Sequence, residues 1–255
     1  RRNGQAQNVT KMLIENGAQY IVNISASPWI FGKHHARDNR LKFLKQDSGD
    51  AFVLFCYVNC TGAQNNGKNI VTFDGGSTVY NRNGEPIFLA EKPYAEELLV
   101  IDTDDTGGPA VSRKENPSIA QKLEALLVGL RHLKNIRGRE EHQKFVLGLS
   151  GGVDSSVMAA ILTLAVGPDK VLGVNMPTRF NSDKTKQAAQ AVAEQLGIAY
   201  LEIPIEELSL ANEQLLERYT PDEQPRLLTT LQKGNIAAKI RGTNVLSNLA
   251  AQYGA

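Results

Sequence analysis

Residues 145–156 read Phe145-Val-Leu-Gly-Leu-Ser-Gly-Gly-Val-Asp-Ser-Ser156, and this stretch decides the fold of the second half of the chain. Its apolar beginning predicts a buried strand at Phe145–Gly148, its paired glycines predict a tight turn, and a helix is predicted over Ser156–Val166. The following elements are predicted as a strand, a helix and a strand: Lys170–Met176, Lys184–Leu196 and Ile198–Ile203. This alternation predicts an α/β domain with a doubly wound parallel sheet.

The glycine turn has the chemistry of an anion cradle. Glycines expose backbone N–H groups in a tight turn, and the dipole of the helix that follows places partial positive charge where a phosphate would lie. The hydroxyls of Ser150, Ser155 and Ser156 can donate to phosphate oxygens, and Asp154 can hold a Mg²⁺ ion that bridges them. The loop has neither the lysine of a Walker loop nor the Gly-x-Gly-x-x-Gly spacing of a dinucleotide site. The alternative is an ordinary helix cap.

Composition and charge restrict the class of protein. The chain has 255 residues, of which 42% are hydrophobic and 22% charged, as in globular proteins. Its net charge of +1 is not that of a protein that binds nucleic acid or an anionic membrane. The longest apolar stretch, Val157–Val166, is much shorter than the roughly 20 residues of a membrane span. Two cysteines cannot build a disulfide framework. We therefore predict a cytoplasmic protein with no nucleic-acid or membrane partner.

The sequence before residue 104 predicts two helices, several strands and a hairpin turn, and a linker follows them. Helices are predicted over Val9–Gly17 and His34–Gln46, and a hairpin turn at Asn81-Arg82-Asn83-Gly84. The predicted strands are Gln19–Ile24, Ala51–Asn59, Lys68–Phe73, Ser77–Tyr80, Pro86–Leu89 and Glu96–Ile101. Because the residues that follow are charged and include Gly-Gly-Pro, we predict a linker at 104–117. It would separate a domain at 1–103 from one at 118–255, which opens with an amphipathic helix over Ser118–Ile136.

The cradle resembles a known signature. Ser-Gly-Gly-x-Asp-Ser is typical of the N-type ATP pyrophosphatases, or PP-loop enzymes, and together with Asn175-Met-Pro-Thr-Arg179 it looks like an NAD synthetase. The resemblance implies an adenine nucleotide α-hydrolase-like, Rossmann-like domain. Those enzymes split ATP between its α- and β-phosphates to adenylate a carbonyl oxygen, and ammonia then displaces AMP. By this resemblance ATP would contact Gly148, Leu149, Ser150, Gly151, Gly152, Val153, Asp154, Ser155 and Ser156, with Mg²⁺ on Asp154.

A further segment, Lys233–Gly242, is similar to the NAD synthetase sequence Glu-Asn-Ile-Gln-Ala-Arg-Ile-Arg-Gly. It departs from that sequence at Gly234, Ala237 and Lys239, and it keeps Asn235, Ile240, Arg241 and Gly242. The resemblance implies that Asn235 contacts deamido-NAD and that Arg241 belongs to the same site. From the residues alone, Asn235 also fits as the N-cap of a helix over Ile236–Ala251, a role worth about 1 kcal/mol.

The first half resembles the nitrilase-like glutaminase domain that is fused to bacterial NAD synthetases. The stretches that carry the resemblance are Asn23-Ile-Ser-Ala-Ser-Pro-Trp-Ile-Phe-Gly-Lys33 and Phe73-Asp-Gly-Gly-Ser77. It implies part of an α-β-β-α sandwich, with Ser27 and Lys33 contacting the substrate glutamine. Without it, Ser27 would be interpreted as an ordinary turn hydroxyl and Lys33 as a solvated surface charge.

The glutaminase nucleophile is expected outside this chain. The family uses a Cys, a Glu and a Lys, which the resemblance places upstream of Arg1, so no catalytic residue is assigned here. Cys60 follows a predicted strand, but no helix is predicted to begin there and lower its thiol pKa. Cys56 lies within the strand, and both are interpreted as packed thiols. The four histidines, His34, His35, His132 and His142, lack metal-site spacing and are expected at the surface.

These resemblances together imply a glutamine-dependent NAD synthetase. ATP and Mg²⁺ would adenylate deamido-NAD, and ammonia released from glutamine would give NAD, AMP, pyrophosphate and glutamate. The family's members are usually homo-oligomers. Two alternatives stay open: another PP-loop amide ligase, such as a GMP or asparagine synthetase, and a catalytically inactive nucleotide-binding or assembly fragment. Because the chain opens at Arg1-Arg2 without Met and closes directly after a helical pattern, we expect a piece of a longer protein.

Overall fold

The computed structural model describes residues 8–104, 108–114, 117–136, 144–219, 224 and 226–255. The chain divides into two units, Arg1–His132 and Leu133–Ala255, which are described separately. The division falls within α3 (Ser118–Ile136), whereas the sequence predicts a linker at 104–117. Residues 105–107 and 115–116 of that segment, like His142, lie outside the described residues, and the linker stays a prediction.

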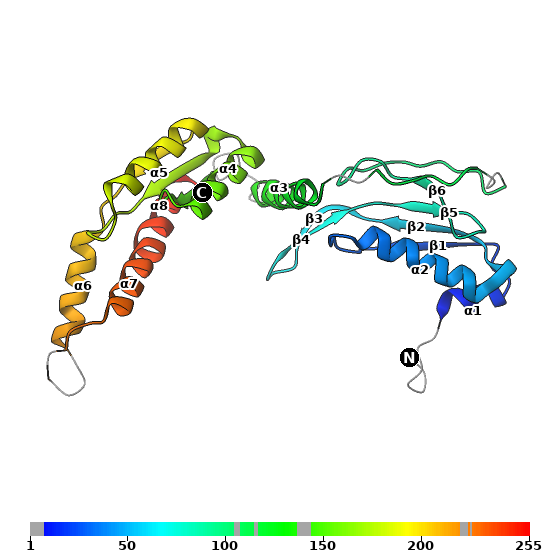
Figure 1. The fold of residues 1–255 in the computed structure, drawn as a ribbon, viewed down its shortest axis with the longest axis horizontal. Coiled ribbons are helices and arrows are strands. Elements are labelled where there is room, and N and C mark those ends of the chain that lie inside the picture. Colours follow the sequence, from blue (N-terminus) through cyan, green and yellow to red (C-terminus); the bar gives the residue numbers. More distant parts are fainter. Residues whose placement is uncertain (1–7, 105–107, 115–116, 137–143, 220–223, 225) are drawn as a thin grey trace. The chain divides into compact units, whose positions relative to one another are not determined.

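The first unit places two helices on one face of a mixed sheet (Figure 1). The sheet has the strand order β1-β2-β5-β6, with β1 (Tyr20–Ser25), β2 (Leu54–Asn59), β5 (Thr78–Tyr80) and β6 (Pro86–Leu89). β1 and β2 are parallel, from Tyr20 opposite Leu54 to Ser25 opposite Asn59, and the other pairs are antiparallel. The helices are α1 (Val9–Glu15) and α2 (Lys33–Ser48), and a 3₁₀ turn at Gly49–Ala51 leads into β2.

The core of this unit lies between the helices and the sheet. Side chains of α2 meet alternate residues of β2 and β5, so that one face of each strand is buried. The buried set is Ile14, Ile21, Leu41, Leu44, Phe52, Phe55, Tyr57 and Tyr80. On the opposite face of the sheet, Leu54, Val79 and Ile87 form a smaller cluster.

Most predicted elements of the first unit are present, and two predictions are wrong. The hairpin turn is confirmed, since Asn81 accepts the N–H of Gly84 and β5 pairs with β6. The polar segment after Asn59 contains an unpredicted strand, β3 (Thr61–Asn65), which pairs with β4 (Ile70–Asp74) in a separate antiparallel sheet. The predicted strand at Glu96–Ile101 is absent from the described structure. Leu98 and Val100 are 88% and 85% exposed, whereas Ile101 packs on the cluster of Leu54, Val79 and Ile87, so only one side of the segment is covered.

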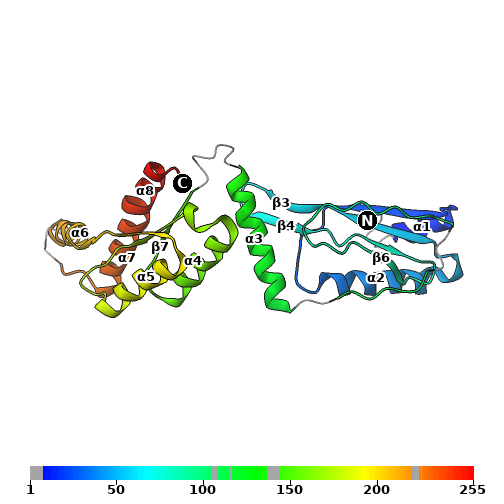
Figure 2. The same ribbon diagram turned by 90° about the horizontal axis from the view of Figure 1, so that it is seen from above.

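The second unit is a parallel sheet with helices on both faces (Figure 2). Its strands are β7 (Phe145–Gly148), β8 (Val171–Asn175) and β9 (Ala199–Glu202), in that order. The crossover helices α4 (Val153–Val166) and α5 (Asp183–Leu196) contact the sheet, with a 3₁₀ turn at Pro168–Lys170. Leu172, Val174 and Met176 pack on the other side against α7 (Thr230–Lys239), a π-helical segment (Ile240–Leu246) and α8 (Ser247–Tyr253). This arrangement confirms the predicted α/β class. Helix α6 (Glu206–Arg218) was not predicted.

The helix that carries Asn235 begins earlier than the sequence predicts. Its N-cap is Thr229, whose side chain accepts the N–H of Gln232, while Gln232 accepts the N–H of Thr229. This capping box starts α7 at Thr230 and leaves Asn235 inside the helix. The N-cap role predicted for Asn235 is therefore wrong.

Within the described residues, no helix has both the length and the apolar character needed to cross a membrane.

Candidate functional site

The glycine turn of the second unit lies where β7 ends and α4 begins. Leu149 is fully buried, and its N–H donates to the carbonyl of Val174 at 2.8 Å, which fixes the turn to β8. Gly173 provides room for the Leu149 side chain, because a Cβ at Gly173 would stand 3.0 Å from Leu149 Cδ2. The loop is therefore held at the carboxyl end of the sheet, where ligands bind in open α/β folds.

Gly151 fixes the loop on its second side. Its φ of +80° lies in the left-handed region, and a Cβ there would overlap the carbonyl oxygen of Thr185 and stand 2.9 Å from the amide nitrogen of Ala189. The first turns of α5 thus pack directly on the loop backbone. Only glycine fits both the conformation and the space.

The start of α4 is open to solvent. Its N-cap is Gly152, which has no side chain to accept the first N–H groups of the helix, and Val153 is 75% exposed. The first N–H groups of a helix have no partner within it and carry the positive end of its dipole. The geometry therefore suits an anion.

The three loop hydroxyls already form local hydrogen bonds. Ser155 and Ser156 both donate to the carbonyl of Gly152, at 3.0 and 2.9 Å, and Ser155 Oγ lies 3.1 Å from Ser150 Oγ. To donate to a phosphate, each of the two donor hydroxyls must rotate away from Gly152. The sequence predicts which hydroxyls line the loop, but not that they hold its shape.

Asp154 lies exposed in the first turn of α4. Its carboxylate is a hard oxygen donor of the kind that Mg²⁺ prefers, and that ion commonly shares its ligands with substrate phosphates. Within the described ranges, no three His, Cys, Asp or Glu side chains gather closely enough to hold a metal on their own. Asp154 therefore fits a metal that binds together with a nucleotide.

The end of β8 contacts the π-helical segment through Arg241. The Arg241 Nε donates to the carbonyl of Met176 at 3.2 Å, and its side chain is half-buried. Leu246, in the same segment, would stand 3.6 Å from a Cβ at Gly148. Such π-helical turns are frequent at functional sites. Asn235 is exposed on α7, six positions earlier in the sequence.

A buried carboxylate pairs with two basic residues near the carboxyl end of β8. Glu213 on α6 has a side chain that is 5% exposed, and it accepts both Arg179 Nη2 at 2.9 Å and Lys233 Nζ at 3.3 Å. Arg179 also contacts Glu206 at the start of α6. The hydrogen bonds that Arg179 donates to Glu206 and Glu213 raise the pKa of its guanidinium. Glu213 thus ties α6 and α7 to the turn after β8, a role that no motif in the sequence indicates.

In the first unit, Ser27 and Lys33 belong to one turn after β1. Asn59, at the end of β2, accepts the N–H of Ser27 and donates to its carbonyl. Lys33, the first residue of α2, donates from Nζ to the carbonyl of Pro28 at 2.7 Å. Both residues are half-buried. For Lys33 this differs from a fully solvated surface charge, whereas the turn position of Ser27 fits either interpretation.

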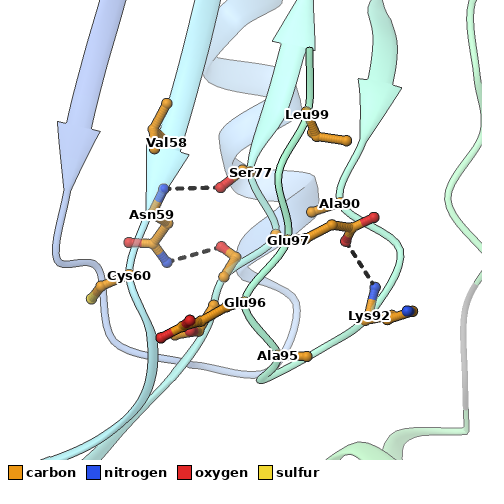
Figure 3. A pocket seen from close by; sticks show the side chains of 13 residues that line it. Val58, Asn59, Cys60, Ser77, Ala90, Lys92, Ala95, Glu96, Glu97 and Leu99 are labelled. Atoms are coloured by element: carbon orange, nitrogen blue, oxygen red, sulfur yellow. Dashed lines mark hydrogen bonds between the residues drawn. The ribbon is translucent and has the colours of Figure 1, made fainter.

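A hollow of about 370 Å³ opens beside the end of β2 (Figure 3). Asn59, Cys60 and Ser77 line it from the sheet, and Lys92 and Glu97 from the segment after β6. Cys60 is followed directly by β3, so no helix N-terminus faces its thiol. Burial raises the pKa of the Cys56 thiol. These surroundings agree with a packed thiol at Cys56, whereas Cys60 lines the hollow.

His34 departs from the predicted surface position. Its Nε2 lies 3.0 Å from the buried carboxylate of Asp74. Burial alone would raise the pKa of Asp74, but the hydrogen bond and charge of His34 outweigh it, and the net pKa is lowered. His34 also packs on Gly76, where a Cβ would stand 2.9 Å from His34 Cε1.

A glycine turn and an open helix start in the first crossover of a parallel sheet form the geometry at which α/β proteins bind nucleotide phosphates. Comparison with known proteins makes the assignment specific. The sequence model of the family described as NAD synthase matches residues 128–254, and through these residues the chain belongs to that family.

The likeness extends over both units. The chain is 34% identical over 248 residues to a glutamine-dependent NAD(+) synthetase of Synechocystis, with 95% of this chain and 41% of that protein covered. A protein of the same name from Thermotoga maritima is 30% identical over 273 residues, covering 93% and 45%. The solved glutamine-dependent NAD+ synthetase of Acinetobacter baumannii in complex with ADP superposes with a TM-score of 0.81, at 26% identity, over 97% of this chain and 44% of that one. The chain thus spans less than half the length of these relatives.

Proposed function

We propose that this chain is part of a glutamine-dependent NAD synthetase. The second unit would bind ATP and deamido-NAD, and the first unit would contribute to the site that hydrolyses glutamine. The observation that supports the proposal best is the uncapped start of α4 behind the glycine turn, held between β8 and α5. The match of residues 128–254 with the NAD synthase family supports an NAD-forming ligase over other kinds of nucleotide-binding protein.

The phosphates of ATP would lie on residues Gly148–Ser156. The free N–H groups at the start of α4 would donate to phosphate oxygens, and the hydroxyls of Ser150, Ser155 and Ser156 would rotate to join them. Asp154 would hold Mg²⁺, which when bound offsets the negative charge of the phosphates. The loop would change little on binding, because Leu149 and Gly151 already fix its backbone.

The reaction would proceed in two displacements. A carboxylate oxygen of deamido-NAD attacks the α-phosphorus of ATP, the bond to the bridging oxygen breaks, and pyrophosphate leaves on the cradle. Ammonia then attacks the acyl carbon and gives up a proton. The bond from that carbon to the oxygen bridging it to phosphorus breaks, and AMP leaves with this oxygen. Asn235 and Arg241 would contact deamido-NAD, and the bond from Arg241 to Met176 would hold that side chain beside the end of β8.

The first unit would help bind the glutamine that supplies ammonia. Ser27 and Lys33 would contact the amino acid from the turn after β1. The nucleophilic cysteine, the base and the oxyanion lysine are expected upstream of this sequence, so glutamine hydrolysis belongs to a full-length protein that contains it. A cytoplasmic location and a homo-oligomeric state remain predictions of the same resemblance.

The Asp154→Ala variant tests the nucleotide site. In a full-length protein that contains this sequence, pyrophosphate release in the presence of ATP, Mg²⁺ and deamido-NAD should fall by about two orders of magnitude. Asp169→Ala is the matched control, because its carboxylate lies beyond the far end of α4 with a side chain 72% exposed. Turnover of Asp154→Ala within about threefold of the unmodified protein would contradict the assigned role.

Xanthosine monophosphate or aspartate in place of deamido-NAD should give no pyrophosphate, and release with either would indicate a different PP-loop ligase.

A further inference from the structure

We propose that Asn59 is a positioning residue for the glutamine site, which acts by holding the backbone of Ser27. The inference rests on the proposed function, because it assigns Ser27 to glutamine. Asn59 is the last residue of β2 and is only 7% exposed, at the end of an otherwise apolar strand. A buried carboxamide must find partners for its oxygen and its two hydrogens, so the position of its neighbours is restricted.

All of these polar groups are used, and two of the three bonds go to a single residue. The Asn59 Oδ1 accepts the N–H of Ser27 at 2.8 Å, and the Nδ2 donates to the carbonyl of Ser27 at 3.1 Å. The side chain therefore pairs with Ser27 as a neighbouring strand would pair with its backbone. The second Nδ2 hydrogen goes to the carbonyl of Gly75 at 2.9 Å. One side chain thus joins the turn after β1 to the glycine turn after β4.

The remaining contacts of the turn show where Asn59 acts. At its start, the Cys60 N–H donates to the carbonyl of Ser25 at 3.1 Å. At its end, the Trp29 N–H donates to the carbonyl of Thr72 at 2.7 Å. Ser27 lies midway between these two anchors. The backbone N–H of Asn59 donates to Ser77 Oγ at 3.1 Å, as Figure 3 shows. This bond fixes the backbone from which the Asn59 side chain reaches Ser27.

Asparagine is suited to this position by its chemistry. A carboxylate at residue 59 would still accept the N–H of Ser27, but it would lose both donors and face the carbonyl oxygens of Ser27 and Gly75. The turn would then shift, and a displacement of about 1 Å at a substrate contact can cost about a hundredfold in rate. The Ser27 side chain itself would be unchanged in Asn59→Asp.

The test compares two nitrogen donors in a full-length protein that contains this sequence. NAD formation is measured with glutamine and, separately, with ammonium chloride. For Asn59→Asp we expect kcat/KM for glutamine to fall at least about tenfold, chiefly through KM, while the ammonia-supported rate stays within about twofold. A change confined to glutamine cannot arise from loss of folded protein, because the ammonia reaction measures the same molecules.

Asn81→Asp is the matched control. Asn81 is 8% exposed, and its Oδ1 also accepts two backbone N–H groups, from Asn83 at 2.9 Å and Glu85 at 3.0 Å, but in the β5–β6 turn. We expect Asn81→Asp to lower the melting temperature without changing KM for glutamine. If Asn59→Asp does not fold, Asn59→Ser, which introduces no charge, is compared in the same way.

The outcomes separate the inference from the function on which it rests. An unchanged KM for glutamine in the folded Asn59 variant, or an equal rise in Asn81→Asp, would overturn the positioning role alone. An unmodified protein that makes NAD with neither donor would overturn the proposed function, and this inference with it.

Discussion

The backbone of Gly151 packs directly against the carbonyl oxygen of Thr185, and the space between them has no room for a Cβ atom. The contact joins the candidate phosphate loop to the first turns of α5, 34 positions further along the chain. The loop conformation therefore depends on the crossover helix as well as on its own glycines.

Gly151→Ala should destabilise the second unit strongly. The substitution adds the strain of a left-handed backbone, at φ +80°, to an overlap with the Thr185 carbonyl, and we expect a loss of about 3 kcal/mol in the free energy of unfolding. Gly152→Ala is the control. Its φ is −80° and the nearest atom would be Ser150 Oγ at 3.4 Å, so we expect a loss under about 1 kcal/mol. Urea unfolding followed by circular dichroism measures both, and similar losses would contradict the packing argument.

Asp38 should make the first unit sensitive to acid. Its carboxylate accepts Tyr80 Oη at 2.6 Å and Arg113 Nη2 at 3.3 Å. Burial alone would raise the pKa of Asp38, but the hydrogen bonds from Arg113 and Tyr80 outweigh it, and the net pKa lies below the ordinary value of 3.8. A lowered folded-state pKa stabilises the fold above the unfolded-state value, and this contribution is lost as the pH falls through the folded-state pKa.

Asp38→Asn should therefore lower stability at neutral pH and weaken its dependence on acid below about pH 4. We expect a loss of about 2 kcal/mol at pH 7, because Arg113 loses its charged partner. Thermal unfolding between pH 2 and pH 7 gives the measurement, and Asp50→Asn, whose carboxylate is fully exposed, serves as the control. Parallel pH curves for Asp38→Asn and the unmodified chain would show that Asp38 does not contribute. Asp74, paired with His34, should retain its own share of the acid sensitivity in both.

Glu213→Gln should loosen the connection between α6, α7 and the turn after β8. Its carboxylate is nearly buried and accepts Arg179 and Lys233, so a neutral side chain leaves two cations without their shared partner. Because both cations are partly exposed, we expect a loss of about 2 kcal/mol in the free energy of unfolding rather than the larger cost of a deeply buried pair. Glu207→Gln, exposed on the same helix, should change stability by less than about 0.5 kcal/mol. Equal effects of the two substitutions would rule out a special role for Glu213.

The sequence predicted those features that depend on neighbouring residues. Strand β7, the glycine turn and α4 follow from one continuous stretch of apolar, glycine and serine residues, and the structure has them in place. The segment Glu96–Ile101 shows the limit of such patterns. Its apolar run Leu98–Ile101 is typical of a buried strand, but such a run needs paired strands and cover on both faces, and Leu98 and Val100 are exposed.

Contacts between distant residues could not be predicted in this way. Asn59 and Ser27 are 32 positions apart, and the signal in the sequence was only a polar residue at the end of an apolar strand. Glu213 and Arg179 are 34 apart, and Glu213 lies in a helix that was not predicted.

For the candidate site, the loop residues follow from their motif, whereas the hydrogen bonds of Ser155 and Ser156 to Gly152 depend on the folded conformation of the loop. The sequence contains the capping box as Thr-x-x-Gln at 229–232, a signal that a helix start after Asn235 overlooks.

Two substitutions in α7 should separate a structural cap from a ligand contact. Thr229→Ala removes the acceptor for the Gln232 N–H and should cost about 1 kcal/mol in the free energy of unfolding, with little effect on the KM for deamido-NAD. Asn235→Ala should do the reverse. Asn235 is exposed inside the helix, where alanine is the better helix former, so stability should be unchanged or higher by up to about 0.5 kcal/mol. Under the proposed function the same variant should raise the KM for deamido-NAD about tenfold, the effect of losing a hydrogen bond worth about 1.4 kcal/mol. Thermal unfolding and steady-state kinetics on the same preparations decide between the two roles. A destabilised Asn235→Ala with an unchanged KM would return Asn235 to a purely structural role.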